Sequence, residues 1–582
     1  MAFPCDQAVL HIDNQSRSLY FKNDKFEFPP FDAIADDGLC SRSAATLEPR
    51  ISSRLPLENL PPPPGRILVV GIDQGPLPDM LVERGYQVSL LTPDLKRFEF
   101  QGVSVRSLCE AQRAALADFS DSEAGFDAAV FQETARYLNA VDLFNKASDL
   151  LRLNGRVLII DEVGLKREAG DEIASLPFLT YILAQAKRCG FDLVRRQDIS
   201  DEAVLTLECL SKAFESRQDK NNEGLHVSED LIRELTSILR RHRQEHEENR
   251  RGYLYLEWEK LNKPQWRIKA VTGTDDQLAI RNMFKEVFGY TMSADLWQWK
   301  YGPSHGMGTA VWKDRKMVGY YGGIIRDVLY FSRPVTAVQI ADVMVAESER
   351  GYRRGPYYLS ASTFPETYAG YASPILLGYG FPTTQAMRVA EAFKLYEEVG
   401  RIVELRWTAI DKKVFVNSTV RQLNPLNEPS DQKIVDRLWA AMAADFPDAV
   451  IGTRNWEFVK HRYYDHPEKS YELFLVVSRF SNKPLGIGVL LCEEGLCRLI
   501  DVIAPLKNLR ILIRQIRSVL GRRNIPALSM WITENFRERF ADTGCTYHPQ
   551  EVRIPHCVCY QGPSAEQVRD KWWLTWGDSD FM

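Results

Sequence analysis

The sequence lacks any apolar run long enough to cross a membrane and any segment typical of a secretory leader. No stretch of its 582 residues approaches the roughly 18 consecutive apolar residues that a membrane helix needs. Residues 1–15 lack a basic start followed by a continuous apolar core. Charge of either sign is not in large excess, because 73 Lys and Arg against 78 Asp and Glu leave a net charge of -5. We therefore expect a cytoplasmic protein with no nucleic-acid or membrane partner.

Cysteine follows no recognisable spacing. The ten cysteines include no C-x-x-C pair, which favours reduced thiols over a disulfide framework. The spacing of His242 and His246 suits a metal, but their stretch is so charged that we expect a solvated helix face. A C-terminal cluster has metal-binding residue types in no familiar zinc spacing, so no metal is expected there either: Cys545, His548, His556, Cys557 and Cys559.

The length predicts three or four domains, since a single core seldom exceeds a few hundred residues. We place an N-terminal extension and proline-rich linker at residues 1–60, whose role stays open, and a first domain at 61–262. Two further lobes are placed at 263–425 and 426–582.

Strands and helices alternate in the first domain, which predicts a parallel, doubly wound sheet of the α/β class. The strands are expected over 66–71, 86–91, 126–133 and 156–163. A helix over 143–155 is expected to end at Gly155. Ligands of such sheets bind at the carboxyl ends of the strands. The candidate residues at those ends are Gly71, Gly75, Thr92, Asp94, Glu133, Asp161 and Glu162.

These segments resemble the class I S-adenosylmethionine-dependent methyltransferases over about residues 60–262. The turn from Gly71 to Gly75, the FDAAVFQETARYL segment and the LLRLNGRVLIIDEV segment carry the resemblance. It implies a Rossmann-like fold that ends in an antiparallel pair, expected at 203–210 and 252–261 with a helix over 228–251 between them.

The same resemblance implies S-adenosylmethionine as cofactor. Gly71, Asp73 and Gly75 would form the cofactor turn, Asp94 would bind the ribose hydroxyls, and Glu133 would hold the acceptor or take its proton. Asp73 also marks a departure, since the family has a glycine there and an acid at Val69. A cofactor-binding domain and a degenerate structural domain therefore both stay open.

Residues 339–356, QIADVMVAESERGYRRGP, have the composition of an anion-binding turn. An apolar strand runs into a turn rich in arginine and glycine, and Pro356 suits the first turn of a following helix. Glycine lets a backbone approach a phosphate closely, a helix start offers free N–H groups, and arginine adds charged donors.

This turn resembles the acyl-CoA pyrophosphate loop of the GNAT acyltransferases, although Arg353 stands where a glycine is usual. The resemblance implies acyl-CoA as cofactor, with acetyl-CoA as the expected donor. The residues expected to hold it are Val345, Arg350, Gly351, Arg353, Arg354 and Gly355.

Two residues are catalytic candidates by the same resemblance. Asp342, in the central strand, would be the general base that frees a substrate amine of its proton. Tyr396, expected in a helix over 384–400, would protonate the departing thiolate. Each has a plainer alternative: Tyr396 could pack its ring in an amphipathic helix, and Asp342 could be a buried acid paired with an arginine.

The second half contains an internal duplication. Residues 485–505 match 317–347, with Asp501 in the place of Asp342, and residues 454–467 match 294–303. We therefore expect two GNAT-like α+β lobes, of which the second lacks the arginine turn and cannot hold CoA. Burial of Trp572, Trp573 and Trp576 is expected rather than a role in lining a cleft.

Together these patterns predict a bifunctional transferase. It would transfer an acyl group from acyl-CoA to a small amine, such as an amino sugar or an amino acid derivative, and a methyl group from S-adenosylmethionine. Two alternatives stay open: an acyltransferase with a non-catalytic methyltransferase-like domain, and a non-enzymatic binding or regulatory protein. Sequence does not name the acceptor, the acyl chain or the oligomeric state.

Overall fold

The structure is a computed structural model, and it divides the chain into two compact units, Met1–Arg267 and Ile268–Met582. It describes all residues except 1–10, 14–17, 22–23, 27–50, 72–76, 92–109, 113–124, 167–175, 206, 209–210, 212–228, 273–275, 303–304, 371–373, 411–416, 424–427, 494, 561 and 581–582. Within the described residues, no helix has both the length and the apolar composition needed to span a membrane.

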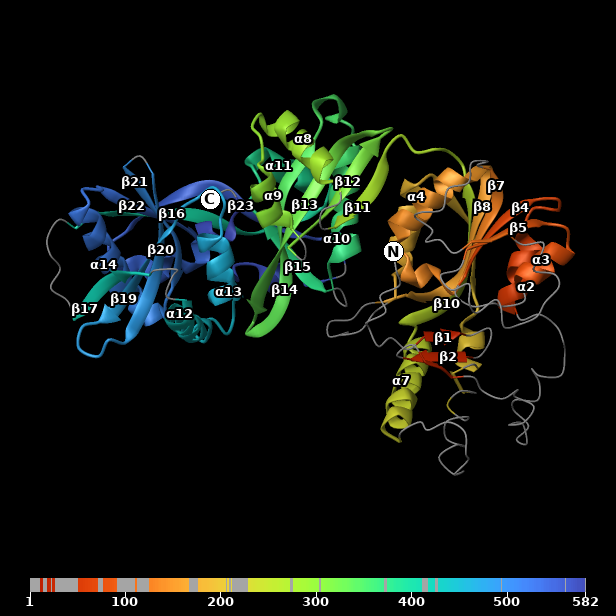
Figure 1. The fold of residues 1–582 in the computed structure, drawn as a ribbon, viewed down its shortest axis with the longest axis horizontal. Coiled ribbons are helices and arrows are strands. Elements are labelled where there is room, and N and C mark those ends of the chain that lie inside the picture. The colour runs from red at the N-terminus through yellow and green to blue at the C-terminus, as the bar shows by residue number, and fades with distance from the viewer. Residues whose placement is uncertain are drawn as a thin grey trace. The chain divides into compact units, whose positions relative to one another are not determined.

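A seven-stranded sheet forms the centre of the first unit (Figure 1). Its strands, in spatial order, are β6 (Glu110–Gln112), β5 (Gln87–Leu91), β4 (Arg66–Gly71), β7 (Phe126–Gln132), β8 (Leu151–Gly164), β10 (Arg251–Lys260) and β9 (Phe191–Asp198). The pairs from β6 to β8 are parallel, whereas β10 is antiparallel to both β8 and β9. This is the expected Rossmann-like sheet with an antiparallel end.

Helices cover both faces of this sheet, because alternate strand residues point to opposite sides. Ile67 and Val69 pack with α2 (Ile51–Asn59) and α3 (Leu77–Glu83), whereas Leu68 and Val70 pack with α4 (Ala140–Leu150) and α5 (Leu179–Arg188). Helix α7 (Glu229–Glu247) precedes β10. An additional antiparallel sheet comprises β1 (His11–Asp13), β2 (Ser18–Phe21) and β3 (Asp24–Phe26).

Three predicted boundaries in this unit are wrong. Residues 203–205 are helical, so the antiparallel partner of β10 is β9 rather than 203–210. Helix α4 ends at Leu150, not at Gly155, because Leu151 is extended and pairs with Phe126. Strand β8 continues to Gly164, so Asp161 and Glu162 lie within it instead of at its end.

The second unit begins with the sheet of the first lobe. Its strands, in order, are β11 (Arg267–Thr272), β12 (Gly306–Lys313), β13 (Lys316–Tyr330), β14 (Arg333–Val345) and β15 (Ile375–Gly380). Its helices are α8 (Gln277–Phe288), α9 (Ala294–Tyr301), α10 (Pro356–Tyr368) and α11 (Thr384–Ala392). Strands β12, β13 and β14 are antiparallel, and β14 pairs in parallel with β15 after the crossover through α10.

The second lobe repeats this topology. Its sheet has the order β17 (Ser418–Gln422), β19 (Glu472–Ser478), β20 (Pro484–Glu493), β21 (Leu496–Ile503), β22 (Ala527–Thr533), β16 (Tyr396–Thr408) and β23 (Thr546–Cys557). Strands β19, β20 and β21 are antiparallel, and α14 (Leu509–Arg522) leads to β22, which is parallel to β21. The remaining helices are α12 (Glu428–Ala443), α13 (Trp456–Val459) and α15 (Ala565–Val568). The α/β and α+β fold classes predicted for the units are both present.

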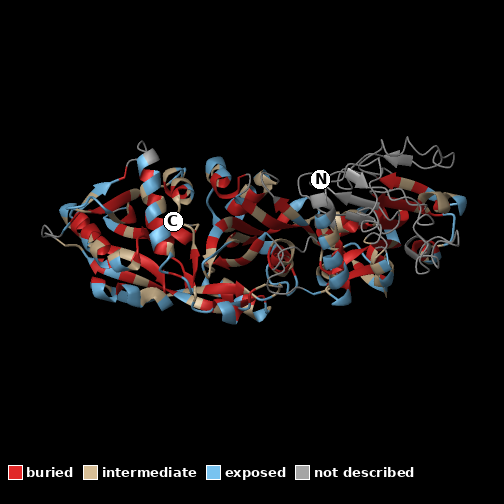
Figure 2. Ribbon diagram, turned by 90° about the horizontal axis from the view of Figure 1, so that it is seen from below, coloured by how far each residue is buried: buried red, intermediate tan, exposed pale blue. Residues whose placement is uncertain are grey.

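The two lobes exchange strands. Strand β16, which follows the first lobe in sequence, pairs with β22 in the second sheet. In return, β18 (Val450–Gly452) pairs with β13, and β24 (Trp572–Trp573) pairs with β18. One apolar core therefore contains residues of both lobes, and the strands in it are buried (Figure 2). The expected burial of the C-terminal tryptophans is confirmed: Trp572, Trp573 and Trp576.

Helix α11 is shorter than predicted, which moves Tyr396 out of a helix. Lys394 adopts a φ of 57°, and the Leu395 amide donates to the Ala390 carbonyl, so the helix ends and the chain reverses. Tyr396 then opens β16 and pairs with Cys557 of β23.

The expectation of reduced thiols is also wrong at one place. Cys492 and Cys497 face each other across the hairpin of β20 and β21, with Cα atoms 4.1 Å apart, and form a disulfide. The pairing arises from the register of the hairpin, because directly opposite residues of antiparallel strands bring their Cβ atoms together.

Candidate functional site

The turn between β14 and α10 depends on glycine at two positions. Gly351 has a φ of 92°, in the left-handed region that favours glycine. Gly355 is the N-cap of α10 and is followed by Pro356 in the first turn. A Cβ atom added to Gly355 would lie 2.7 Å from the Tyr352 Cβ, closer than real side chains allow. Because both positions are glycine, no side chain from them covers the backbone of the turn at the start of α10.

Arginine side chains place positive charge at this turn. Arg350, Arg353 and Arg354 are exposed. The nearby Glu349 is buried, and its carboxylate is 2.7 Å from the Lys313 ammonium, so its charge is compensated. The first amides of α10 have no partner within the helix. Guanidinium groups and helix-start amides together provide the donors that a phosphate needs. The six residues predicted to hold acyl-CoA all lie in or beside this turn.

Strand β15 ends before β14 does. The parallel pairing of the two strands runs from Thr336 and Ile375 to Ile340 and Gly380, the last residue of β15, whereas β14 continues to Val345. The register with β13 shifts in the same part of β14, where Asp342 has a φ of 50°. Such a bulge bends a strand and re-aims its side chains.

Asp342 accepts two hydrogen bonds at this bulge. Its Oδ2 lies 2.7 Å from the Lys300 Nζ and 2.7 Å from the Tyr301 hydroxyl, both at the end of α9. Lys300 also donates to Asp580 Oδ2 at 3.0 Å, and Gln339 donates to Asp580 Oδ1 at 3.0 Å. The predicted base is therefore a partly buried acid, and its cationic partner is a lysine rather than an arginine.

Burial and the neighbouring opposite charges shift the pKa values of these groups in opposite directions. Burial raises the pKa of Asp342, and Lys300 opposes that rise while Asp580 adds to it. Burial alone would lower the pKa of Lys300, but the carboxylates of Asp342 and Asp580 outweigh it and raise that pKa above its ordinary value. Lys300 thus stays charged between two carboxyl groups.

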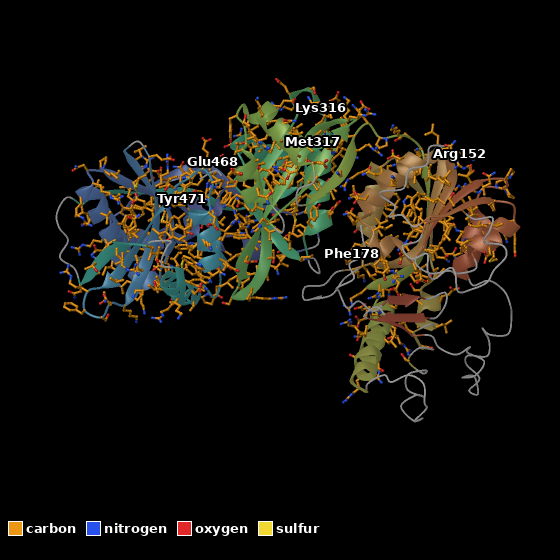
Figure 3. The ribbon with its side chains drawn as sticks, viewed as in Figure 1. Arg152, Phe178, Lys316, Met317, Glu468 and Tyr471 are labelled. Carbon is orange, nitrogen blue, oxygen red and sulfur yellow. A yellow bond between two sulfur atoms is a disulfide. The ribbon has the colours of Figure 1, made fainter. Side chains whose placement is uncertain are left out.

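The second lobe has a matching cluster at Asp501. Its Oδ2 accepts a hydrogen bond of 2.9 Å from the Tyr463 hydroxyl, and its carboxylate is 3.2 Å from the Arg454 guanidinium. Arg462, which precedes Tyr463 as Lys300 precedes Tyr301, donates to the Tyr471 hydroxyl labelled in Figure 3. The chain after β21 instead continues through Ala504 and Pro505 into a 3-10 turn, Leu506–Asn508, without glycine or arginine.

Tyr396 lines a small, partly open apolar pocket. Residues of β13, β14, α10 and β15 of the first lobe and of β16 and β23 line this pocket. Burial raises the pKa of Tyr396 well above its usual value, and the neighbouring thiols of Cys557 and Cys559 add to this rise. The phenol is therefore protonated at neutral pH.

Asp342 and this pocket are on opposite faces of the sheet. Val338 and Ile340 line the pocket, whereas Gln339 between them bonds Asp580 of the Asp342 cluster. Alternate residues of a strand point to opposite faces. The structure therefore does not join the predicted base and the predicted acid in one polar cluster.

In the first unit, the predicted cofactor turn begins where β4 ends at Gly71. Asp73, Gly75 and Asp94 lie outside the described residues, so their roles stay predictions. Glu133 follows β7 directly, at the carboxyl end of the sheet, with a φ of 50° and its amide bonded to the Ile160 carbonyl.

A buried charge cluster surrounds Glu133. Its Oε1 accepts a hydrogen bond of 2.8 Å from the Tyr253 hydroxyl, and the Arg136 guanidinium lies 3.7 Å from Oε2. Glu133 is thus held by a residue of β10 and by the turn after β7.

The same arginine also contacts the two acids of β8. Arg136 lies 2.5 Å from Asp161 and 2.9 Å from Glu162. Further partners of Glu162 are Arg251 at 2.9 Å and His246 at 3.5 Å.

The two acids of β8 respond differently to burial. Burial raises the pKa of Asp161, which the Arg136 contacts only partly offset. Glu162 is equally buried, but Arg251 and Arg136 together outweigh burial and hold its pKa well below the ordinary value. Burial next to Arg251 lowers the pKa of His242 to about 3.

Comparisons with known proteins show similarity in structure only. No protein-family model matches this chain, and neither does any curated protein. A probable N-acyltransferase from Enterococcus faecalis V583 is 10% identical, with a TM-score of 0.41, and the match covers 50% of this chain and 72% of that one. A putative sarcosine dimethylglycine methyltransferase from Galdieria sulphuraria is 13% identical, with a TM-score of 0.32, over 36% of this chain and 83% of that one.

The chain joins a unit with a Rossmann-like sheet to a unit of two α+β lobes with repeated topology. In the first unit, sequence reasoning missed Arg136, Arg251 and Tyr253 as partners of Glu133, Asp161 and Glu162. In the second unit it missed Lys300 and Asp580. One signal was available: the segments around Tyr301 and Tyr463 match, and both tyrosines bind the duplicated aspartate.

Proposed function

We propose that this chain is an acyl-CoA-dependent N-acyltransferase that acts on a small amine. The observation that carries the proposal is the turn at Gly351 and Gly355, where three exposed arginines surround the start of α10. A diphosphate placed there would meet helix-start amides and guanidinium groups at once. The second lobe has no such turn, so the proposal assigns one acyl-CoA site to the two lobes.

The reaction is attack by a neutral amine on the thioester carbonyl, with cleavage of the carbon–sulfur bond. Asp342 takes the amine proton, directly or through a water, and Lys300 and Tyr301 hold its carboxylate in place. Both of those contacts are made by Oδ2, so we assign the proton to Oδ1. Burial raises the pKa of Asp342 towards the working pH, which is the direction that makes a carboxylate a better base.

Tyr396 supplies the proton for the departing thiolate in this proposal. Its raised pKa keeps the phenol protonated at neutral pH, so that it can donate a hydrogen bond that stabilises the departing thiolate. Because Tyr396 lines the pocket on one face of the sheet and Asp342 lies on the other face, the thioester would have to lie beyond Ile340, where β15 has ended.

For the first unit we assign S-adenosylmethionine to the edge of the sheet after β4 and β7. This cofactor supplies an electrophilic methyl group, and the protein mainly orients the acceptor. Gly71, Asp73, Gly75 and Asp94 are the residues expected to hold it, with Glu133 beside the acceptor. An amino sugar or an amino acid derivative would then be tailored at two positions by one protein.

A specific observation favours a second candidate function for this unit, which is binding without methyl transfer. Glu133 already accepts from Tyr253 and lies next to Arg136, so its carboxylate is engaged. A base held in this way is less available to an acceptor. Methyl transfer in the presence of candidate amines distinguishes the two functions.

The decisive experiment reverses charge at the turn. The double variant Arg353→Glu, Arg354→Glu should weaken coenzyme A binding by roughly 100-fold, since each lost charged hydrogen bond costs at least about 1.4 kcal/mol. Isothermal titration calorimetry with coenzyme A measures this directly.

The second lobe offers a matched control. Arg510 and Arg514 are exposed on α14, the counterpart of α10, so Arg510→Glu, Arg514→Glu changes the net charge equally at the other lobe. This variant should bind coenzyme A like the unaltered protein. Equal losses in both variants, or no coenzyme A binding at all, would refute the assigned acyl-CoA site.

A further inference from the structure

Two free thiols lie next to each other at the end of β23. Cys557 is the last residue of this strand, and Cys559 follows it after one residue. Residues two apart on a strand point to the same face, and the chain bends at Cys559, which brings the two side chains together. The two sulfur atoms are 3.2 Å apart, about 1.1 Å more than the roughly 2.05 Å of a disulfide bond.

Backbone hydrogen bonds hold the two thiols in this position. Cys557 pairs with Tyr396 of β16, and the amide of Val558, between the two thiols, donates to the Leu395 carbonyl at 2.9 Å. The backbone that carries the pair is therefore anchored to β16. When two reacting groups are held together in this way, the reaction between them becomes intramolecular and is strongly favoured.

The pair is accessible to a small reagent. Both cysteines are partly exposed, and Cys557 lines the partly open pocket beside Tyr396. Burial raises the pKa of the Cys557 thiol well above its usual value, and the hydrogen bond with Cys559 adds to this rise, so Cys557 is protonated at neutral pH. Because the thiolate is the attacking form of cysteine, Cys559 is the residue that attacks first.

We propose that Cys557 and Cys559 form a redox-active dithiol, which a small disulfide such as oxidised glutathione converts to an intramolecular disulfide. Cys559 attacks one sulfur of the small disulfide, which forms a mixed disulfide and releases one thiol. Cys557 then attacks the sulfur of Cys559 and releases the second thiol. The small disulfide takes up two electrons and the protons of both cysteines, and it leaves as two thiols. This site does not depend on the proposed acyltransferase function.

Peptide mapping of the unaltered protein tests the proposal. Trypsin releases both cysteines on one peptide, residues 554–569, which contains no other cysteine. The folded full-length protein is treated with oxidised glutathione, then denatured, alkylated with iodoacetamide and digested without reduction. We expect this peptide to have lost two hydrogen atoms and to carry neither glutathione nor an alkyl group. Dithiothreitol, added before alkylation, should restore alkylation of both cysteines. A peptide with glutathione or alkyl groups in place of the internal bond overturns the proposal.

Cys545 is the matched control within the same digest. It is a partly exposed free thiol whose Sγ donates to the Phe540 carbonyl at 3.4 Å, and it is the only cysteine of the tryptic peptide 540–553. After the same treatment, Cys545 should carry an alkyl group or glutathione. A disulfide that joins this peptide to residues 554–569 overturns the assigned pairing.

Single substitutions test the order of attack. Cys557→Ser removes the second thiol, so the mixed disulfide on Cys559 should accumulate and appear as one glutathione on peptide 554–569. Cys559→Ser leaves only the protonated Cys557, which should stay free of glutathione and be alkylated after denaturation. Glutathione on Cys557 of the second variant, with none on Cys559 of the first, overturns the assigned order.

Discussion

Asp342 and Asp501 occupy matching positions in matching strands, and each accepts a hydrogen bond from a tyrosine. The two side chains differ in how much of their surface is exposed to solvent. The Asp342 side chain keeps 9% of its surface exposed, whereas that of Asp501 has none. The first carboxylate is therefore partly accessible to solvent, whereas the second is fully buried and paired with Arg454.

Amide substitutions should separate these two roles. Asp342→Asn should lower kcat for acyl transfer about 100-fold or more, the usual contribution of a general base. Asp501→Asn should keep kcat and reduce the free energy of unfolding by about 1 to 3 kcal/mol, because a buried charged partner is lost. Steady-state kinetics and urea unfolding of both proteins give the comparison. Equal losses of kcat would contradict the assignment of Asp342.

At the scale of elements, the sequence predicted best where a pattern is local. Strands β4, β5, β7 and β10 follow from apolar runs bounded by turns, and the arginine–glycine turn follows from its residue types. The end of α11 did not follow. Residues up to 400 keep a helical pattern, but Tyr396 pairs with Cys557 of β23, a strand that is remote in sequence. No residue near Tyr396 reveals that partner.

The same limit applies to the candidate site. The Asp342 cluster needs Asp580, which is 280 residues from Lys300. The disulfide likewise depends on the register of β20 and β21 rather than on a cysteine motif. Spacing along the chain predicts groups on one turn or one strand, and it does not predict which distant elements bring their side chains together.

Helix α7 gives a prediction for the pH dependence of stability. His242 is buried near Arg251, Glu162, Arg241 and His246, and burial lowers its pKa to about 3. Below pH 6.5, the ordinary pKa of histidine, this side chain is protonated in the unfolded chain. In the folded chain it stays neutral down to about pH 3. This contribution to stability is therefore complete above pH 6.5 and is lost as the pH falls, with a slope of at most about 1.4 kcal/mol per pH unit.

His242→Leu should flatten this pH dependence. Urea unfolding of the first unit between pH 7 and pH 5 should show a smaller loss of stability for the variant than for the unaltered protein. Identical slopes for the two proteins would mean that His242 is protonated in the folded state.

At the scale of the whole molecule, the chain consists of two compact units with separate cores. The two lobes of the second unit are not separable in the same way, because β16 and β18 cross between their sheets. The first unit and the unit of two repeated lobes should therefore unfold as two cooperative systems.

Differential scanning calorimetry should resolve two transitions in the full chain. Acyl-CoA at 100 times its dissociation constant should stabilise one by about 2.7 kcal/mol, and S-adenosylmethionine should do the same for the other. Adenosine triphosphate is a suitable control for a non-specific effect of anions. One transition that responds to both ligands would contradict the division into two independent units.

The hydrogen bond between Lys300 and Asp580 joins residues that are far apart in the sequence, so it can form only late in the synthesis of the chain. At about 5 to 20 residues per second, the ribosome needs roughly 15 to 60 s to add the 280 residues between them. During that time the first lobe has its arginine turn and Asp342, but it lacks the second carboxylate of Lys300 and the strands β18 and β23. A chain that stops early therefore presents the arginine turn without Asp580, and the proposed acyltransferase function requires that both lobes be complete.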